Sequence, residues 1–285
     1  STFSQASAAL GYDLWQLVQQ GPVEKLNQTN FTQPALLTAS VAIWRLWHQQ
    51  SSSSPAFLAG HSLGEYSALV CAGVLSLTDA VKLVEKRGEF MQASVPEGVG
   101  AMAAVIGLDD QLIIDACAQA ANGEVVSAVN FNSPGQVVIA GHKAAVERAG
   151  ELCKAAGAKR VLPLPVSVPS HCALMSDAAD KLAVDLANIT FNTPVINVVN
   201  NVDVAIETSG DAIKAALVKQ LYSPVRWSET ISKLGEQGIT QMVEVGPGKV
   251  LQGLVKRINK GISCVSFNTQ DTLVKARELT QVSES

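Results

Sequence analysis

The residues best suited to chemistry surround Ser62, in the run Gly60-His61-Ser62-Leu63-Gly64. The four apolar residues before the run, 56–59, predict a strand buried on both faces, and a helix is expected after it. A serine in this G-x-S-x-G pattern sits on a sharp turn that lifts its hydroxyl clear of the backbone, and free helix N–H groups can then hold an oxyanion. The pattern indicates a nucleophile for acyl chemistry. The alternative is a glycine-rich turn with an inert serine, because the pattern alone is weak.

A serine nucleophile needs a base, and the chain offers four histidines. His48 fits a helix face, and His61 adjoins the serine on a tight turn, so that its ring should point elsewhere. His142 follows a glycine and fits a solvated position. His171 follows the run 168–170, whose proline-stiffened backbone could fix a ring at the mouth of the sheet. Spacing therefore favours His171 without excluding the other three.

Strands and helices alternate along the sequence in two patterns. Residues 98–166 predict the order β-α-β-β-α-β, which is typical of a ferredoxin-like unit. The flanking parts, 1–97 and 167–285, predict helices that alternate with strands, which favours a parallel sheet. We therefore predict an α/β protein with a parallel-sheet, hydrolase-like large domain and an inserted ferredoxin-like small domain. The strands are predicted at 56–59, 100–108, 124–131, 135–140, 160–166, 196–200 and 241–245, and the helices at 3–19, from 76, and at 110–121, 144–156, 173–186, 211–221 and 250–258.

The composition is that of a folded chain. Its 285 residues are 47% hydrophobic and 16% charged, which excludes a disordered protein. The net charge of −4 is opposite in sign to that of a general nucleic-acid binder. No apolar run reaches the roughly 18 residues that cross a bilayer, and the start does not resemble a secretion signal. The five cysteines are widely spaced without a C-x-x-C pair, which argues against a zinc cluster or disulfides and favours a reducing cytoplasm.

Five separated motifs occur in order along the chain. They are GHSLGEYSAL at 60–69, Arg87-Gly88, NFNSPGQ at 130–136, VPSH at 168–171 and EVGPG at 244–248. Together they resemble the motifs of bacterial malonyl-CoA:acyl carrier protein transacylases, and the similarity covers essentially the whole chain. The resemblance implies transfer of a malonyl group from malonyl-CoA to the phosphopantetheine thiol of acyl carrier protein, in fatty-acid biosynthesis. It implies a malonyl-serine intermediate and neither a metal nor a prosthetic group.

The same resemblance implies roles for individual residues. Ser62 matches the nucleophile and His171 the base, in a pair without a carboxylate. Gln220 matches the residue whose main-chain carbonyl holds the far imidazole nitrogen. Arg87 matches the arginine that binds the malonyl carboxylate, and the backbone N–H of Leu63 matches an oxyanion donor. Three further residues match positions that line the site or the coenzyme path: Gln33, Asn130 and Asn132.

The chemistry of Arg87 can be weighed without the resemblance. Malonyl differs from acetyl by a carboxylate, and the planar fork of an arginine can bind both of its oxygens, which a lysine cannot do. Position alone, however, favours a charge on an exposed helix face beside Glu85 and Glu89.

One family motif has no counterpart in this sequence. The family carries a Gly-Gln-Gly-Ser-Gln segment near its N-terminus, whose first glutamine contributes to the oxyanion hole, and this sequence opens at Ser1 beyond that point. Loss of one oxyanion donor typically lowers turnover by about 10²–10³. The function is therefore predicted for the intact protein.

The partners follow from the same reading. Malonyl-CoA and an acidic acyl carrier protein are expected, with neither nucleic acid nor membrane, and a monomer is expected. A basic patch should receive the carrier, and four residues are candidates: Lys249, Lys256, Arg257 and Lys260. Two other functions remain open. One is a serine thioesterase or hydrolase with water as acceptor, and the other is a non-catalytic module that only binds the carrier.

Overall fold

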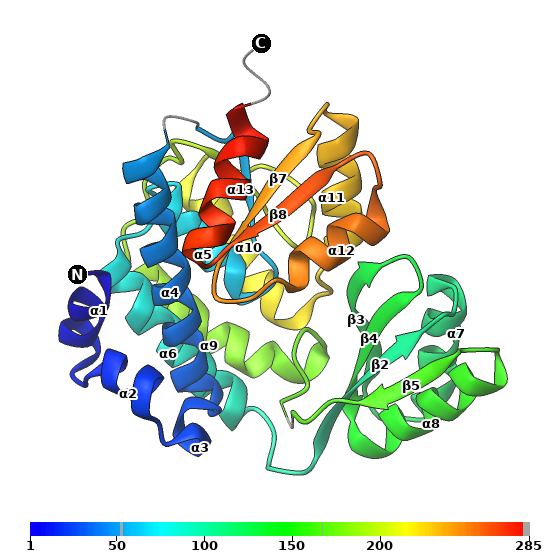
Figure 1. The fold of residues 1–285 in the computed structure, drawn as a ribbon. Helices are drawn as coiled ribbons and strands as arrows, with labels where there is room; N and C mark the ends of the chain where they lie inside the picture. The colour runs from blue at the N-terminus through cyan, green and yellow to red at the C-terminus, as the bar shows by residue number, and fades with distance from the viewer. Residues whose placement is uncertain (52–53, 167, 282–285) are drawn as a thin grey trace.

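The computed structural model describes residues 1–51, 54–166 and 168–281. Four helices open the chain (Figure 1): α1 (Thr2–Leu10), α2 (Leu14–Gln20), α3 (Val23–Leu26) and α4 (Thr29–Gln50). The single helix predicted over 3–19 is wrong. Gly11 ends α1 in the left-handed conformation with φ 80°, and the Asp13 side chain accepts from the Gln16 N–H to start α2.

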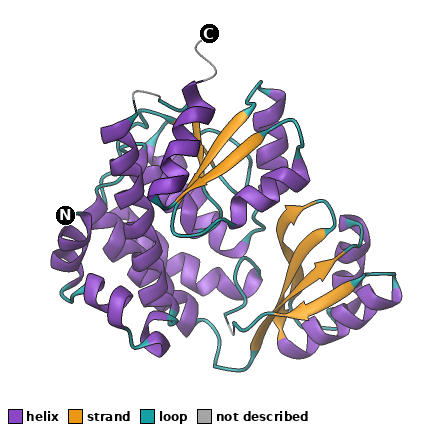
Figure 2. Ribbon diagram, in the orientation of Figure 1, coloured by secondary structure: helices purple, strands orange, loops and turns teal. Residues whose placement is uncertain are grey.

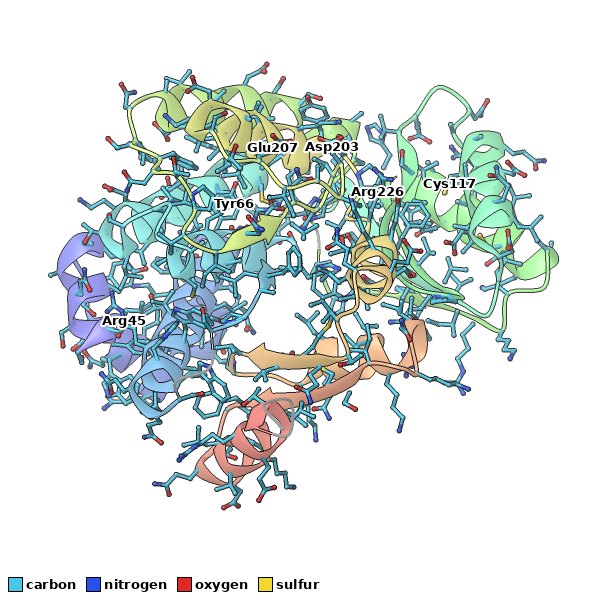
Figure 3. The ribbon with its side chains drawn as sticks, turned by 90° about the horizontal axis from the view of Figure 1, so that it is seen from above. Arg45, Tyr66, Cys117, Asp203, Glu207 and Arg226 are labelled. Atoms are coloured by element: carbon cyan, nitrogen blue, oxygen red, sulfur yellow. The ribbon has the colours of Figure 1, made fainter. Side chains whose placement is uncertain are left out.

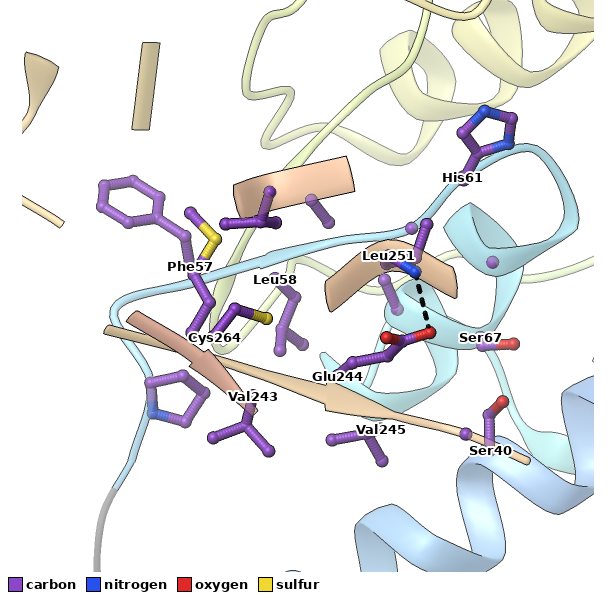
Figure 4. Close-up of a pocket in the computed structure, with 18 of the residues that line it drawn as sticks. Ser40, Phe57, Leu58, His61, Ser67, Val243, Glu244, Val245, Leu251 and Cys264 are labelled. Atoms are coloured by element: carbon purple, nitrogen blue, oxygen red, sulfur yellow. Dashed lines mark hydrogen bonds between the residues drawn. The ribbon is translucent and has the colours of Figure 1, made fainter. Parts of the chain in front are cut away.

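The strands of the large part pair in parallel, as predicted, but they form two separate sheets. β1 (Phe57–Ala59) pairs with β6 (Asn197–Val199), and β7 (Gln241–Val245) pairs with β8 (Ser263–Phe267). A cavity of about 850 Å³ lies between β1 and β7, and side chains of both strands line it (Figure 4). Among the described residues, the parallel strands thus form two two-stranded sheets instead of the expected single sheet.

Helices surround these strands (Figure 2). The main core is apolar and contains side chains of α1, α4, α5, α6, α9 and α10. The side chain of Ser76 caps α6 by accepting from the Asp79 N–H, as its sequence predicts. The carboxylate of Glu244 accepts the N–H groups of Leu251 and Gln252 and so caps the start of α12. The bounds are α5 (Leu63–Cys71), α6 (Leu77–Ala93), the 3₁₀ turn η1 (Ala173–Met175), α9 (Ser176–Ala187), α10 (Gly210–Tyr222), α11 (Trp227–Glu236), α12 (Val250–Ile258) and α13 (Gln270–Gln281).

The smaller part has the predicted β-α-β-β-α-β order. Its antiparallel sheet has the strand order β3-β4-β2-β5, and α7 and α8 pack on it around a core of their own. Residues 98–166 remain our proposed span for this domain, and residue 167, the predicted start of the returning large domain, lies outside the described residues. The bounds are β2 (Gly100–Ile106), α7 (Asp110–Ala120), β3 (Val126–Ser133), β4 (Gln136–His142), α8 (Lys143–Ala155) and β5 (Arg160–Pro163).

The edge strand β3 joins the small part to the large one. Val225 donates its N–H to the Val129 carbonyl at 2.8 Å and accepts from the Phe131 N–H at 3.0 Å. A second contact is a hydrogen bond of 2.6 Å that the Arg257 side chain donates to the Gln136 side chain. Arg226, next to Val225, lies at this junction in Figure 3. The two parts are thus held together along β3 and at the first residue of β4.

Two kinds of feature are absent from the described ranges. No helix there is both long and apolar enough to cross a bilayer. No group of three or more His, Cys, Asp or Glu side chains there is arranged to hold a metal ion.

Candidate active site

Ser62 occupies the predicted sharp turn between β1 and α5. Its backbone has φ 53° and ψ −111°, a conformation that side-chain-bearing residues rarely adopt. Gly60 makes the turn possible, since a Cβ there would lie 2.0 Å from the Gly64 carbonyl carbon and oxygen. A Cβ on Gly64 would meet nothing within 4 Å. The close approach therefore requires only the first of the two glycines that the sequence suggested.

The imidazole of His171 lies against the Ser62 hydroxyl. Its Nε2 is 2.8 Å from Ser62 Oγ, and its Nδ1 is 2.7 Å from the main-chain oxygen of Gln220. A carbonyl can only accept, so Nδ1 carries the proton and the Nε2 lone pair faces the hydroxyl. Burial, and next the charge of Arg87, lower the pKa of His171 from 6.5 to about 3. The ring is therefore neutral near pH 7 and can take the hydroxyl proton.

The other three histidines have different partners. His61 Nε2 lies 2.7 Å from Asn132 Oδ1, and its ring contacts Trp227. His48 on α4 packs its ring edge-on against another aromatic ring. His142 was expected in solvent but is half-buried, and its Nδ1 accepts the Val125 N–H. The structure thus places His171, of the four, at the serine.

Arg87 is buried in the site rather than spread over a helix face. Its side chain extends from α6 and is 1% exposed. Nη1 donates to Gln33 Oε1 at 2.7 Å, and Nη2 donates to Gln220 Oε1 at 3.1 Å and to Ser62 Oγ at 3.3 Å. Nε is buried without a partner, and within the described part of the chain no carboxylate forms an ion pair with this guanidinium. A buried cation without a direct ion-pair partner in the described structure, beside a nucleophile, is suited to an anionic ligand.

Sequence reasoning missed two residues beneath the turn. Glu65 is 2% exposed, and its Oε2 accepts from Gln220 Nε2 at 2.8 Å and from the Asn201 N–H at 3.0 Å. Asn201 in turn accepts the Ser62 N–H at 2.7 Å and donates to the Gly60 carbonyl at 2.7 Å. In the sequence Glu65 is an acidic side chain in the first turn of α5, which by itself does not indicate a role. No local pattern marks Asn201, which follows β6 and reaches the site only through the fold.

The remaining predicted residues lie around this centre. Leu63 is the first residue of α5, so that its N–H has no carbonyl of its own helix to bind. Gln33 is buried on α4 and touches Arg87. Asn132 binds His61 instead of the serine, and the buried side-chain oxygen of Asn130 has no hydrogen-bond partner among the described residues. Neither asparagine contacts the Ser62–His171 pair.

The four basic candidates cluster at one helix. Lys249 precedes α12, Lys256 and Arg257 lie in its last turn, and Lys260 follows it, all of them exposed. Arg257 also reaches the small part through Gln136.

The large cavity between β1 and β7 lies behind the nucleophile. Gly60, His61, Leu63 and Gly64 line one end of it, whereas its lining does not include Ser62, Arg87 or His171. Figure 4 shows His61 at this end, with Glu244 and Leu251 along the wall. The chemistry is therefore placed by the hydroxyl, imidazole and guanidinium rather than by this cavity.

A hydroxyl on a strand-to-helix turn, a neutral imidazole and free helix N–H groups define a serine-dependent acyl-transfer site on an α/β fold. The chain belongs to the acyl transferase domain family, which matches residues 4–272. Within that family it belongs to the bacterial malonyl CoA-acyl carrier protein transacylases. It is 67% identical over 278 residues to the malonyl CoA-acyl carrier protein transacylase of Escherichia coli (strain K12), covering 98% of this chain and 90% of the relative.

Solved structures are equally similar. One is a type II PKS acyl-carrier protein in complex with its malonyl-transacylase, with a TM-score of 0.96, 62% identity and coverage of 97% of this chain and 90% of that chain. Another is an acyl carrier protein S-malonyltransferase from Vibrio cholerae, with a TM-score of 0.95, 65% identity and coverage of 96% and 90%.

Proposed function

We propose that this chain transfers malonyl groups from malonyl-CoA to the phosphopantetheine thiol of an acyl carrier protein, in fatty-acid biosynthesis. The observation that carries the choice of acyl group is Arg87, a buried guanidinium without an ion-pair partner in the described structure, 3.3 Å from the Ser62 hydroxyl. An acyl chain attached to Ser62 that ends in a carboxylate would bring its charge to this fork. The malonyl group is short and ends in that way.

The first half-reaction loads the serine. Ser62 Oγ forms a bond to the thioester carbonyl carbon while His171 Nε2 takes the hydroxyl proton. The Leu63 N–H, at the start of α5, stabilises the oxyanion. Collapse breaks the carbon–sulfur bond, and the imidazolium returns its proton to the departing sulfur of coenzyme A.

The second half-reaction transfers the malonyl group from Ser62 to the carrier thiol. The carrier thiol loses its proton to His171 as its sulfur attacks the ester, and collapse breaks the bond to Ser62 Oγ and returns the proton to that oxygen. Every proton moves through one imidazole, so the side chains of the site supply the chemistry without a metal or prosthetic group. Each chain carries Ser62, His171 and Arg87 together, so a monomer is sufficient.

The substrate carboxylate should also strengthen the base. The charge of Arg87 is one cause of the lowered pKa of His171. A malonyl carboxylate on the guanidinium cancels that charge and so raises the pKa of His171 when the proton has to move. Malonyl is then favoured in reactivity as well as in binding.

The carrier is expected to dock where α12 meets the small part. Lys249, Lys256, Arg257 and Lys260 are exposed there and can receive an acidic protein. The solved complex of a similar malonyl-transacylase with an acyl-carrier protein supports a carrier as partner. We also propose a cytoplasmic location, since all five cysteines are free thiols, as is usual in reducing compartments.

The fate of labelled malonyl-CoA tests this proposal against its alternatives. With carrier present, label should pass to the carrier thiol much faster than it appears as free malonate. Predominant release of malonate would show a thioesterase or hydrolase instead. Retained carrier binding without any labelled Ser62 would show a non-catalytic module. The matched control is Ser67→Ala, which removes a serine on the same helix that makes no part of the proposed reaction.

A further inference from the structure

The side-chain amide of Gln220 lies between two buried charged groups. Its Oε1 accepts from Arg87 Nη2 at 3.1 Å, and its Nε2 donates to Glu65 Oε2 at 2.8 Å. A guanidinium only donates and a carboxylate only accepts, so these neighbours fix which end of the amide faces which. The cation and the anion therefore face each other through one neutral group and do not touch.

We propose that Gln220 is a neutral spacer that keeps Glu65 from pairing directly with Arg87, and so leaves the guanidinium free for the carboxylate of the acyl group. This inference rests on the proposed malonyl transfer. Glu65 is then a positioning residue, which acts on the substrate only through Gln220 and Arg87.

The contacts of Glu65 favour its ionised form at this depth. Its Oε2 holds both Gln220 and the Asn201 N–H, and Asn201 holds the Ser62 turn. Burial raises the pKa of Glu65 to about 7, against the two hydrogen bonds and the charge of Arg87, which favour the ionised form. The carboxylate thus compensates Arg87 from a distance while it supports the turn.

The other charged groups near Glu65 do not take over the role of Gln220 as a spacer. Asp203 raises the pKa of Glu65 through its charge, and it is itself paired with Lys219. Glu207 borders the same small cavity as Glu65, and Figure 3 places Glu207 and Asp203 in one segment. None of these groups separates Arg87 from Glu65, so the separation depends on Gln220.

A carboxylate at position 220 would behave differently. It would occupy the guanidinium fork from which the acyl carboxylate must be bound, and the substrate would have to displace it. Loss of one charge-assisted hydrogen bond lowers binding by about 10–100-fold. Acetyl has no carboxylate to bind there, so its transfer should be affected much less.

Exchange of the two side chains tests the spacer. The double variant Glu65→Gln with Gln220→Glu has the composition and net charge of the wild type, but its carboxylate touches Arg87. We expect its ratio of kcat/KM for malonyl-CoA to kcat/KM for acetyl-CoA to fall about 10–100-fold, mainly through KM for malonyl-CoA. A ratio within about threefold of wild type, in a folded protein, would overturn the spacer.

The single variant Glu65→Gln decides independently if the double variant does not fold. Its amide oxygen can replace Oε2 and keep both hydrogen bonds, so the ratio should stay within about threefold of wild type. A rise of the ratio by about tenfold or more would mean that Glu65 already competes for Arg87 and that Gln220 does not insulate it. Glu236→Gln, on an exposed helix end, is the matched control. Failure of the wild type to prefer malonyl would reject the proposed function instead.

Discussion

Replacement of Arg87 by lysine keeps the positive charge and removes the planar fork. The guanidinium now donates to Gln33, Gln220 and Ser62 from two nitrogens. A lysine has a single Nζ that acts as a point charge, so it cannot hold both glutamine oxygens and also bind both oxygens of a carboxylate. The variant therefore separates the effect of charge from that of geometry.

The expected magnitude follows from the lost hydrogen bonds. One charge-assisted bond to the substrate is worth about 1.5–3 kcal/mol, which corresponds to about 10–150-fold in kcat/KM for malonyl-CoA. A glutamine oxygen left unpaired in the buried site costs a further 1–3 kcal/mol or so in unfolding free energy. The kcat/KM for acetyl-CoA should change less than about threefold, because acetyl makes no use of the fork.

The assay is steady-state transfer from each acyl-CoA to carrier thiol, with the fold of the variant checked by circular dichroism. Arg45→Lys is the matched control, since Arg45 is exposed and donates to Thr2 and Gln5 on α1. An Arg87→Lys protein that is folded and keeps the wild-type ratio of malonyl to acetyl transfer would refute the assignment of Arg87.

Three further predictions address the turn, the base and the junction. Gly60→Ala should lower the rate of acylation about 10²-fold or more, because its Cβ must displace the turn, and stopped-flow acylation measures this. Gly64→Ala should instead raise helix stability by about 0.5–1 kcal/mol, which thermal melts measure. The pKa of His171 is lowered in the folded protein, so its contribution to stability is present above pH 6.5 and is lost as the pH falls. Relative to His171→Gln, the wild type should therefore lose about 2 kcal/mol of unfolding free energy between pH 7 and pH 5. Urea titrations that give the same pH dependence for both proteins would contradict this. Asn132→Ala leaves the half-buried His61 ring without its Asn132 partner and should cost about 1–3 kcal/mol in denaturant titrations, while an unchanged midpoint would show that this contact does not stabilise the junction.

The sequence predicted those parts of the fold whose signals are local. The capped helix from Ser76, the helix at 250–258 and the order of elements in 98–166 depend on caps and short periodic patterns, and the structure has them. The strand at 263–267 and the helices at 227–236 and 270–281 were missed. Their burial comes from partners distant in the chain, such as β7 for β8.

The site divides in the same way. Ser62 was predicted as the nucleophile because five consecutive residues specify its turn, and His171 was favoured because of the stiff run before it. The resemblance, not spacing, gave Arg87 its role, since position alone favoured an exposed charge and the structure buries it. Glu65 and Asn201 could not be assigned, because their function arises only when β6 and α10 are folded against α5.

The central claim is that Ser62 carries the acyl group and that His171 activates it. Intact-mass and peptide-mapping spectrometry after brief exposure to malonyl-CoA, without carrier, tests it directly. The account predicts one malonyl ester per chain, located on Ser62, absent from Ser62→Ala and formed about 10²–10⁴ times more slowly in His171→Ala. A malonyl group on another residue, or an ester that forms at the wild-type rate without the imidazole, would contradict it.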